Sequence, residues 1–467
     1  MIRRWISISL VFLAGCVRFH PVALSPERVA AELDNRSLTN TALKVFLERN
    51  LHRNFAQWPA PSWDFDMLVL TAFYYEPSLS VARAEWSVAR GGIETAAGRL
   101  NPTVSMTGGY DTGIAGNFSP WMPAIVFDLP LETAGKRKKR MEQALHLSDA
   151  ARWNIATVAW QVRGEVRANL LELYTARETQ ALAAAQAAAQ ADAVRLLEGQ
   201  AKAGSVSAFE ASQTRMALDR ARLTEQQARG AEATARAALA VAMGVPSSAL
   251  KDISFDFAAL RNYPKTLTLR AARQQAVLHR PDILAALSEY EASQDTLRLE
   301  IARQYPDVHL NPGYLWNQGN QGDSEWQLGL SVELPVFNRN QGPVAEAQAR
   351  RISAAARFRA LQAKVLGEVD LALAGYQSAL QESAVVQTFS ETLRDRLDSV
   401  LAQQKAGEAD PLTVANARVE FYAGAAFRLE TNVKISRLFG QLEDAVQNPL
   451  TMPGALLRNT ENNPYEP

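Results

Sequence analysis

The amino-acid sequence predicts a membrane α+β protein made of two similar halves. Three observations support this fold class. Sequence landmarks recur at a spacing of about 204 residues, short segments alternate apolar and polar side chains, and long stretches lack proline. Each half is therefore expected to contribute two strands and three helices, some far longer than the helices of an ordinary globular domain.

The composition excludes one class of partner and one way of crossing a membrane. The 467 residues include 49 basic and 49 acidic side chains, so the formal net charge is zero. A nucleic-acid-binding protein needs a basic face, and we expect no nucleic-acid partner. Beyond the N-terminus, no run reaches the roughly 18 apolar residues that a spanning helix requires. If this chain crosses a membrane, we expect it to do so with strands.

The N-terminus has the features of a lipoprotein signal. A basic start precedes an apolar stretch, Trp5 to Ala14, that is too short to span a bilayer. The stretch ends in Leu13-Ala14-Gly15-Cys16, which resembles the bacterial lipoprotein box. We expect residues 1–15 to be a signal peptide, Cys16 to carry a covalent lipid, and residues 16–63 to form an N-terminal anchor or extended segment. The alternative is a small-residue cleavage site in which the cysteine occurs by chance.

Four landmarks relate the two halves. The pairs are Glu76-Pro77-Ser78-Leu79 with Arg280-Pro281-Asp282-Ile283, Pro102 with Pro306, Leu129-Pro130 with Leu334-Pro335, and Lys202-Ala203-Gly204 with Lys405-Ala406-Gly407. Accidental proline and glycine matches in an alanine-rich chain would not stay in register over this length. We interpret 64–245 and 280–447 as structural repeats, joined by an equatorial link, 246–279, and followed by a tail, 448–467.

Four segments alternate with the period of a β-strand. The expected strands are 103–111, 121–130, 307–316 and 326–335. In the first, Val104, Met106 and Tyr110 fall on one side, and the side chains between them are small or polar. Each segment has about the length of a tilted membrane-crossing strand, with aromatic residues near its ends. A soluble β-sandwich shows the same alternation. Four strands, however, cannot close a barrel with a lumen, so several protomers are expected to share one barrel.

The remaining parts of each repeat are predicted to be helical. The expected ranges are 77–100, 136–200 and 205–243 in the first repeat, and 281–304, 344–404 and 409–446 in the second. At 1.5 Å per residue, 136–200 and 344–404 extend over about 90–100 Å. The shorter helices have the right lengths to stack end to end beside them. A free-standing coiled coil or an adhesive stalk would explain these helices but not the amphipathic hairpins.

The second repeat carries a family resemblance. The stretch that carries it consists of His279-Arg280-Pro281-Asp282-Ile283, then Ala286, Glu289, Ala292 and Ile301, then Tyr305-Pro306-Asp307-Val308-His309-Leu310. It resembles the hallmark of the TolC-like outer-membrane efflux family, and the resemblance extends over about 65–447. It implies a homotrimer with a twelve-stranded outer-membrane β-barrel, to which each protomer gives four strands. It also implies a coiled-coil α-barrel through the periplasm, a mixed equatorial region, and a passive channel that works with a periplasmic adaptor and an inner-membrane pump.

A narrower resemblance concerns the cargo. Leu129-Pro130-Leu131-Glu132-Thr133-Ala134-Gly135-Lys136-Arg137 resembles the Leu-Glu-x-Gly-Gly-Lys-Arg stretch of the CzcC-type branch, except that Ala134 stands where a glycine is usual. It implies efflux of divalent heavy-metal cations with a pump of the resistance-nodulation-division type. A channel for drug efflux or type I protein secretion remains open, as does a non-channel, lipid-anchored scaffold. The basic run 136–140 is expected to meet anionic lipid headgroups or to form a solvated face.

Two turns are the candidate functional site. Gly204 and Gly407 each supply a left-handed helix end. In the resembling family these tips contact the adaptor and constrict the pore, so adaptor contact is expected at Gly204, Ser205, Val206, Ser207, Gly407 and Glu408. The gate candidates are Glu408 and Asp410, together with Thr413 and Asn416, which occupy positions where some members carry gating aspartates.

No catalytic constellation accompanies these turns. None of the five histidines shows the i, i+4 spacing of zinc enzymes, and there is no Walker motif. We therefore expect no enzymatic activity, no metal site and no cofactor apart from the lipid on Cys16. The expected location is the outer membrane, with a lipid anchor and an extension into the periplasm.

Overall fold

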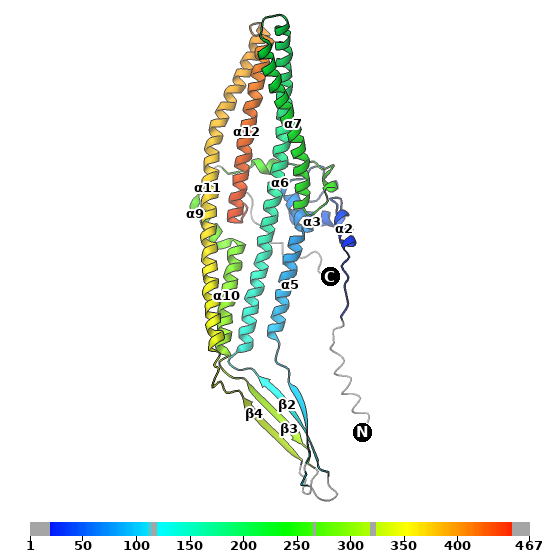
Figure 1. Cartoon of the computed structure of the whole chain (residues 1–467), viewed down its shortest axis with the longest axis vertical. Coiled ribbons are helices and arrows are strands. Elements are labelled where there is room, and N and C mark those ends of the chain that lie inside the picture. Colours follow the sequence, from blue (N-terminus) through cyan, green and yellow to red (C-terminus); the bar gives the residue numbers. More distant parts are fainter. Residues whose placement is uncertain (1–18, 111, 114–118, 265–267, 318–323, 451–467) are drawn as a thin grey trace.

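A computed structural model of the chain describes residues 19–110, 112–113, 119–264, 268–317 and 324–450. The molecule is long and narrow, with a small sheet at one end and two helical hairpins at the other (Figure 1). Short helices and loops surround the middle of the helical part, which we call the equator. None of the helices in these ranges combines the length and the apolar composition that a membrane span requires.

Each repeat contains one long helix flanked by two shorter ones. In the first repeat these are α6 (Lys136–Lys202), α5 (Pro77–Ala97) and α7 (Ala208–Ala242). In the second they are α11 (Gln341–Ala406), α10 (Pro281–Ala302) and α12 (Pro411–Val446). The long helices have 67 and 66 residues, so each extends over about 100 Å. Figure 1 shows α5 and α7 end to end along α6, and α10 and α12 end to end along α11.

Local sequence signals set the helix starts. Proline occupies the first turn of α5, α10 and α12, where its missing N–H removes no hydrogen bond. The side chain of Ser207 caps α7 by accepting from the N–H of Glu210, and Asp410 caps α12 in the same way from Thr413. These caps explain why α7 and α12 begin slightly later than the expected 205 and 409.

The four strands form one antiparallel sheet in the order β1-β2-β3-β4. They are β1 (Thr103–Tyr110), β2 (Trp121–Leu131), β3 (Val308–Leu315) and β4 (Glu325–Val332). Strand β2 pairs with β3, so the hairpins of the two repeats are joined edge to edge. Strand β4 ends at Val332, before the expected 335, because its partner strand β3 begins at Val308, which pairs with Val332.

The described part of the N-terminal segment, 19–63, contains two helices, so it is not extended throughout as was expected for residues 16–63. It contains α2 (Pro26–Asp34) and α3 (Thr41–Leu51), and α4 (Phe65–Tyr75) follows directly. Asn40 caps α3, and Leu43 and Leu47, one turn apart, are fully buried against α4 and its surroundings. The link 246–279 likewise contains η1 (Ser247–Leu250), α8 (Ala258–Arg261) and α9 (Leu269–His279). These segments build the equator.

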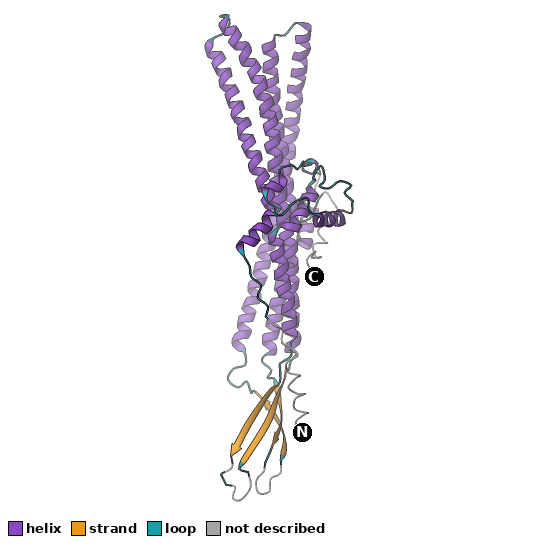
Figure 2. Cartoon of the chain, turned by 90° about the vertical axis from the view of Figure 1, so that its right-hand side faces the viewer, coloured by secondary structure: helices purple, strands orange, loops and turns teal. Residues whose placement is uncertain are grey.

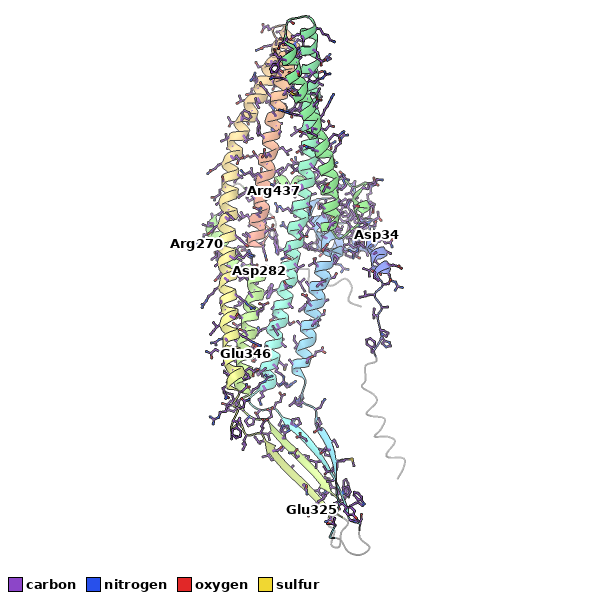
Figure 3. All side chains as sticks on the ribbon, viewed as in Figure 1. Asp34, Arg270, Asp282, Glu325, Glu346 and Arg437 are labelled. Carbon is purple, nitrogen blue, oxygen red and sulfur yellow. The ribbon has the colours of Figure 1, made fainter. Side chains whose placement is uncertain are left out.

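A buried ionic cluster joins the two repeats at the equator. Glu443 of α12 is fully buried, and its carboxylate accepts hydrogen bonds from Arg163, at 3.0 Å, and from Arg167, both on α6. Burial raises the pKa of the neighbouring Asp444 to about 6, against the opposing effect of Arg163 and Arg167. A buried carboxylate is stable only with such partners, so this contact fixes where α12 meets α6. Nearer the surface, Arg437 of α12 pairs with Glu172 of α6 at 2.8 Å (Figure 3).

Arg280 extends this connection to the start of the second repeat. Its guanidinium donates to the carbonyl of Ala445 at 2.7 Å, to Glu368 of α11 at 3.1 Å, and to Asp282. Arg280 is buried, and Pro281 begins α10 directly after it. The Arg-Pro-Asp sequence is therefore an anchor that places the first turn of α10 against α11 and the end of α12.

A second joint holds the base of the sheet to the helices. Lys136, the first residue of α6, is buried and binds the carboxylate of Asp307 at 2.7 Å. The same carboxylate accepts from the N–H of Thr133 at 2.9 Å. Arg137 and Arg140 also make internal contacts, with the carbonyl of Ala97 and with Glu132. Lys136, Arg137 and Arg140 therefore have structural contacts, whereas Lys138 is exposed, and contact of the basic run with lipid headgroups stays a prediction.

We expect Glu443→Gln to reduce the free energy of unfolding by about 3–5 kcal/mol, because it leaves two buried guanidinium groups without a counter-charge. The measurement is thermal or denaturant unfolding of the purified, detergent-solubilised protein near neutral pH. Asp444→Asn is the matched control and should have a much smaller effect, because the raised pKa of Asp444 means that the fold holds its charged form, which still predominates near neutral pH, less favourably than the unfolded chain does. Equal losses in the two variants would contradict the role given to Glu443.

We expect Ala134→Gly to stabilise the joint between β2 and α6. Ala134 has a φ of +52°, and Gly135, with a φ of +68°, follows it. A left-handed conformation costs a residue with a Cβ about 1–2 kcal/mol, and glycine avoids this cost. Unfolding measurements should show a gain of up to about 1 kcal/mol, reduced by the greater freedom of glycine in the unfolded chain. Gly135→Ala is the opposite control, and it should destabilise the protein.

Candidate functional site

One face of the sheet is an almost continuous apolar surface. The register places Val104 opposite Phe127, Ile125 opposite Tyr314, and Leu310 opposite Leu330. Trp326 and Leu328 on β4 are 83% and 79% exposed. Such a face on an isolated sheet would be poorly compatible with water, and its composition matches contact with lipid.

Aromatic side chains gather at the far end of this face. Tyr110 stacks edge-on against Trp121 with ring centroids 5.1 Å apart, and Tyr314 does so against Trp326 at 4.8 Å. Glu325, the first residue of β4, marks this end of the sheet in Figure 3. Aromatic residues of this kind are typical of the level where a membrane-crossing strand leaves the hydrocarbon layer.

The opposite face is polar or lined by small residues. Thr103 lies opposite Asp128, His309 opposite Ser331, and Gly313 opposite Gln327. Nδ1 of His309 is 2.8 Å from Oδ1 of Asp128, so strands from both repeats contribute to one hydrogen-bonded pair. The sheet order leaves β1 and β4 as edge strands, each with one side unpaired within the described protomer. One apolar face, one polar face and two unpaired edges are the features expected of part of a β-barrel wall that separates lipid from water.

The two candidate tips both lie at the end of the molecule opposite to the sheet (Figure 1). Gly204 has a φ of +75°, and the backbone N–H of Ser205 donates to the carbonyl of Gln200 at 3.0 Å. Gly407 has a φ of +80°, and the N–H of Glu408 donates to the carbonyl of Gln403 at 2.9 Å. Both are glycine C-caps in which the left-handed residue lets the chain reverse. Figure 2 shows two helical pairs diverging toward this end.

The tip residues differ in how they are held. Ser205, Ser207, Glu408 and Asp410 are exposed, and Val206 is partly buried. Asp410 accepts from the N–H of Thr413 at 2.6 Å, and this hydrogen bond to the charged form lowers the pKa of Asp410. Thr413 and Asn416 are exposed on the first turns of α12. Of the gate candidates, Asp410 has a structural role as a cap, whereas Glu408 is an exposed charge on the turn itself.

The lipid anchor and possible metal sites are considered next. Cys16 and the signal peptide lie outside the described residues, so the lipid anchor stays a prediction. Within the described ranges, no group of three or more His, Cys, Asp or Glu side chains is close enough together to hold a metal ion.

Neither the ionic cluster around Glu443 nor the pair formed by Asp128 and His309 was predicted from the sequence. Both are formed by residues far apart in the chain, and neither has a local sequence pattern that would have revealed it.

Comparison with known proteins agrees with this construction. A family model described as outer membrane efflux protein matches residues 72–245 and 272–430. The cobalt-zinc-cadmium resistance protein CzcC of Cupriavidus metallidurans is 25% identical over 216 residues, which cover 46% of this chain and 50% of that protein. The pyoverdine export outer membrane protein OpmQ of Pseudomonas aeruginosa is 24% identical over 211 residues, 44% of each. The matched region thus spans about half the length of these curated relatives.

Solved structures confirm the fold class. The outer membrane protein VceC of Vibrio cholerae superimposes with a TM-score of 0.64 at 20% identity, covering 82% of this chain and 95% of that one. The expected TolC-like α+β architecture, with four strands from one protomer, is therefore confirmed. This family and fold are those of outer-membrane channels rather than enzymes, as the sequence analysis expected. Because the family model matches well over half of the chain, in both repeats, this protein belongs to the outer membrane efflux protein family.

Proposed function

We propose that this chain is the outer-membrane channel of a tripartite efflux system. The observation that carries the proposal is the four-stranded sheet, with an exposed apolar face, a polar opposite face and two unpaired edges, at the end of helices about 100 Å long. An open sheet in lipid leaves backbone groups of its edges without partners. Three protomers that pair β4 of one with β1 of the next would close a twelve-stranded barrel and satisfy both edges.

The cargo that we propose is divalent heavy-metal cations. The stretch around Ala134 resembles the CzcC-type branch, and CzcC itself is a relative whose name gives cobalt, zinc and cadmium resistance. The partners would be a periplasmic adaptor and an inner-membrane pump of the resistance-nodulation-division type. The similarity to OpmQ, whose name gives pyoverdine export, favours a second candidate, a channel for organic compounds.

The lipid anchor and the tip roles belong to the same proposal. Covalent lipid on Cys16 would hold the N-terminal segment at the inner leaflet of the outer membrane. The turns at Gly204 and Gly407 would contact the adaptor, because both are exposed at the end farthest from the sheet (Figure 1). Glu408 and Asp410, repeated by threefold symmetry, would place six carboxylates around the closed end of the pore.

A charge placed on the apolar face should prevent membrane insertion. We expect Leu328→Arg to cost about 2–4 kcal/mol per protomer at mid-membrane depth, and therefore to reduce trimer yield and pore formation strongly. The neighbouring Gln327→Arg puts the same charge on the polar face and should preserve both. The measurements are trimer content in outer-membrane extracts and single-channel conductance in planar bilayers. If the wild-type protein formed no pores, the scaffold alternative would replace the channel.

The cargo can be tested by deleting the gene in its host. We expect the deletion strain to become sensitive to zinc, cadmium and cobalt salts, and a plasmid copy to restore resistance. The same strain should be tested in parallel on detergents and dyes. Sensitivity to the organic compounds alone would reject the metal cargo and favour drug efflux.

Gating by the second tip predicts a loss of cation block. We expect Glu408→Gln together with Asp410→Asn to weaken block of the pore by multivalent cations added from the periplasmic side, because the carboxylate ring loses its charge. Asparagine keeps the cap of α12, so folding should be preserved. Ser205→Ala together with Ser207→Asn changes the neutral tip and serves as the control. Unchanged block in the double carboxylate variant would remove Glu408 and Asp410 from the gate.

A further inference from the structure

Asp128 and His309 form an isolated pair of metal-type ligands on the polar face of the sheet. Asp128 lies on β2 of the first repeat, and His309 lies on β3 of the second. Nδ1 of His309 is 2.8 Å from Oδ1 and 3.1 Å from Oδ2 of Asp128. Their side chains are 37% and 38% exposed, so both remain accessible to solvent on the face that the proposed barrel turns toward its lumen.

The separation of these atoms suits two ligands of one cation. Imidazole nitrogen and carboxylate oxygen bind zinc at about 2.0–2.2 Å, which places two neighbouring ligand atoms about 3 Å apart. Oδ1 of Asp128 and Nδ1 of His309 are this close because they share a hydrogen bond, so the paired strands already bring both side chains within reach of one ion. A cation would replace the proton between these two atoms, which requires the neutral imidazole with its remaining proton on Nε2.

The charged groups near His309 have partners of their own: Lys136 and Arg303, which line the same cavity, pair with Asp307 and Glu300. Asp307, the next carboxylate along the chain, is already bound by Lys136 and by the N–H of Thr133. Asn311 lies two residues from His309 on the same face and donates to Ser331 at 3.0 Å, which places neutral polar groups beside the pair. The negative charge of Asp128 therefore faces His309 and solvent.

We propose that Asp128 and His309 form a low-affinity site for a divalent transition-metal cation on the inner wall of the channel. The inference rests on the proposed function, and it adds a binding step inside the barrel. Two side-chain ligands with water in the other positions give weak binding, which suits conduction because a cation must both enter and leave. Imidazole favours zinc, cobalt and related ions over magnesium and calcium. In a trimer the site occurs three times at one level of the wall.

The primary test is zinc binding to the purified full-length protein in detergent, without a polyhistidine tag, by isothermal titration calorimetry. We expect His309→Ala and Asp128→Asn each to weaken binding by about 10–100-fold. Gln327→Ala, which changes the same face without touching the pair, should bind zinc as the wild type does. Magnesium should not compete. Trimer content and thermal unfolding verify that each variant is assembled, and Asp128→Asn keeps an oxygen that can accept from His309.

Zinc affinity that is unchanged in both variants, or equal competition by magnesium, would overturn the inference. A second measurement distinguishes failure of the proposed metal site from failure of the proposed channel. In planar bilayers, with Glu408→Gln and Asp410→Asn also present in every pore so that the acidic tip does not bind the ion, zinc should reduce the current of the otherwise unchanged pore and of Gln327→Ala, but not that of His309→Ala. Pores with the same zinc response in all variants would reject the site while the channel stands. If no pores form, the channel proposal fails, and the calorimetry still decides whether Asp128 and His309 bind zinc.

Discussion

The fully buried carboxylate of Glu443 is the contact on which the arrangement of the two repeats depends. It lies between Arg163 and Arg167, so α12 of the second repeat meets α6 of the first at one position along the helix. A sliding movement of either helix would leave charges buried without partners, which costs several kcal/mol. Apolar contacts between long helices are less selective, because neighbouring turns offer similar packing. The ionic cluster therefore sets a register that the helices alone would leave open.

The equator and the sheet base together act as two fixed points along the molecule. Arg280 binds the carbonyl end of α12 and Glu368 of α11, while Asp307 ties the start of β3 to Lys136 at the start of α6. Between these points α5, α6, α10 and α11 run side by side (Figure 1). Beyond the equator, the two helical pairs diverge toward the tips, where no comparable cluster joins them in the described residues (Figure 2). The proposed gating movement would therefore be easiest in that part of the molecule.

The two ends of the molecule have different surfaces. The sheet end has an apolar face and a polar face that carries Asp128 and His309, whereas the tip end has exposed turns with polar residues. The proposed channel would use both, because one end would contact lipid and the other would contact soluble partners. The two tips differ in charge, since the second is acidic and the first is neutral.

The sequence by itself determined the fold class, the two repeats and the main elements, because these depend on local periodicity, on proline and on glycine. The alternation around Met106 and the glycines at 204 and 407 needed no tertiary information. Tertiary structure alone decided what the charged residues do. Lys136 and Arg140 looked like a basic surface but bind Asp307 and Glu132, and α3 formed where an extended segment was expected. These outcomes, like the pairing of Asp128 with His309, depend on residues that the fold brings together from distant parts of the chain, and such contacts have no periodic signal in the sequence.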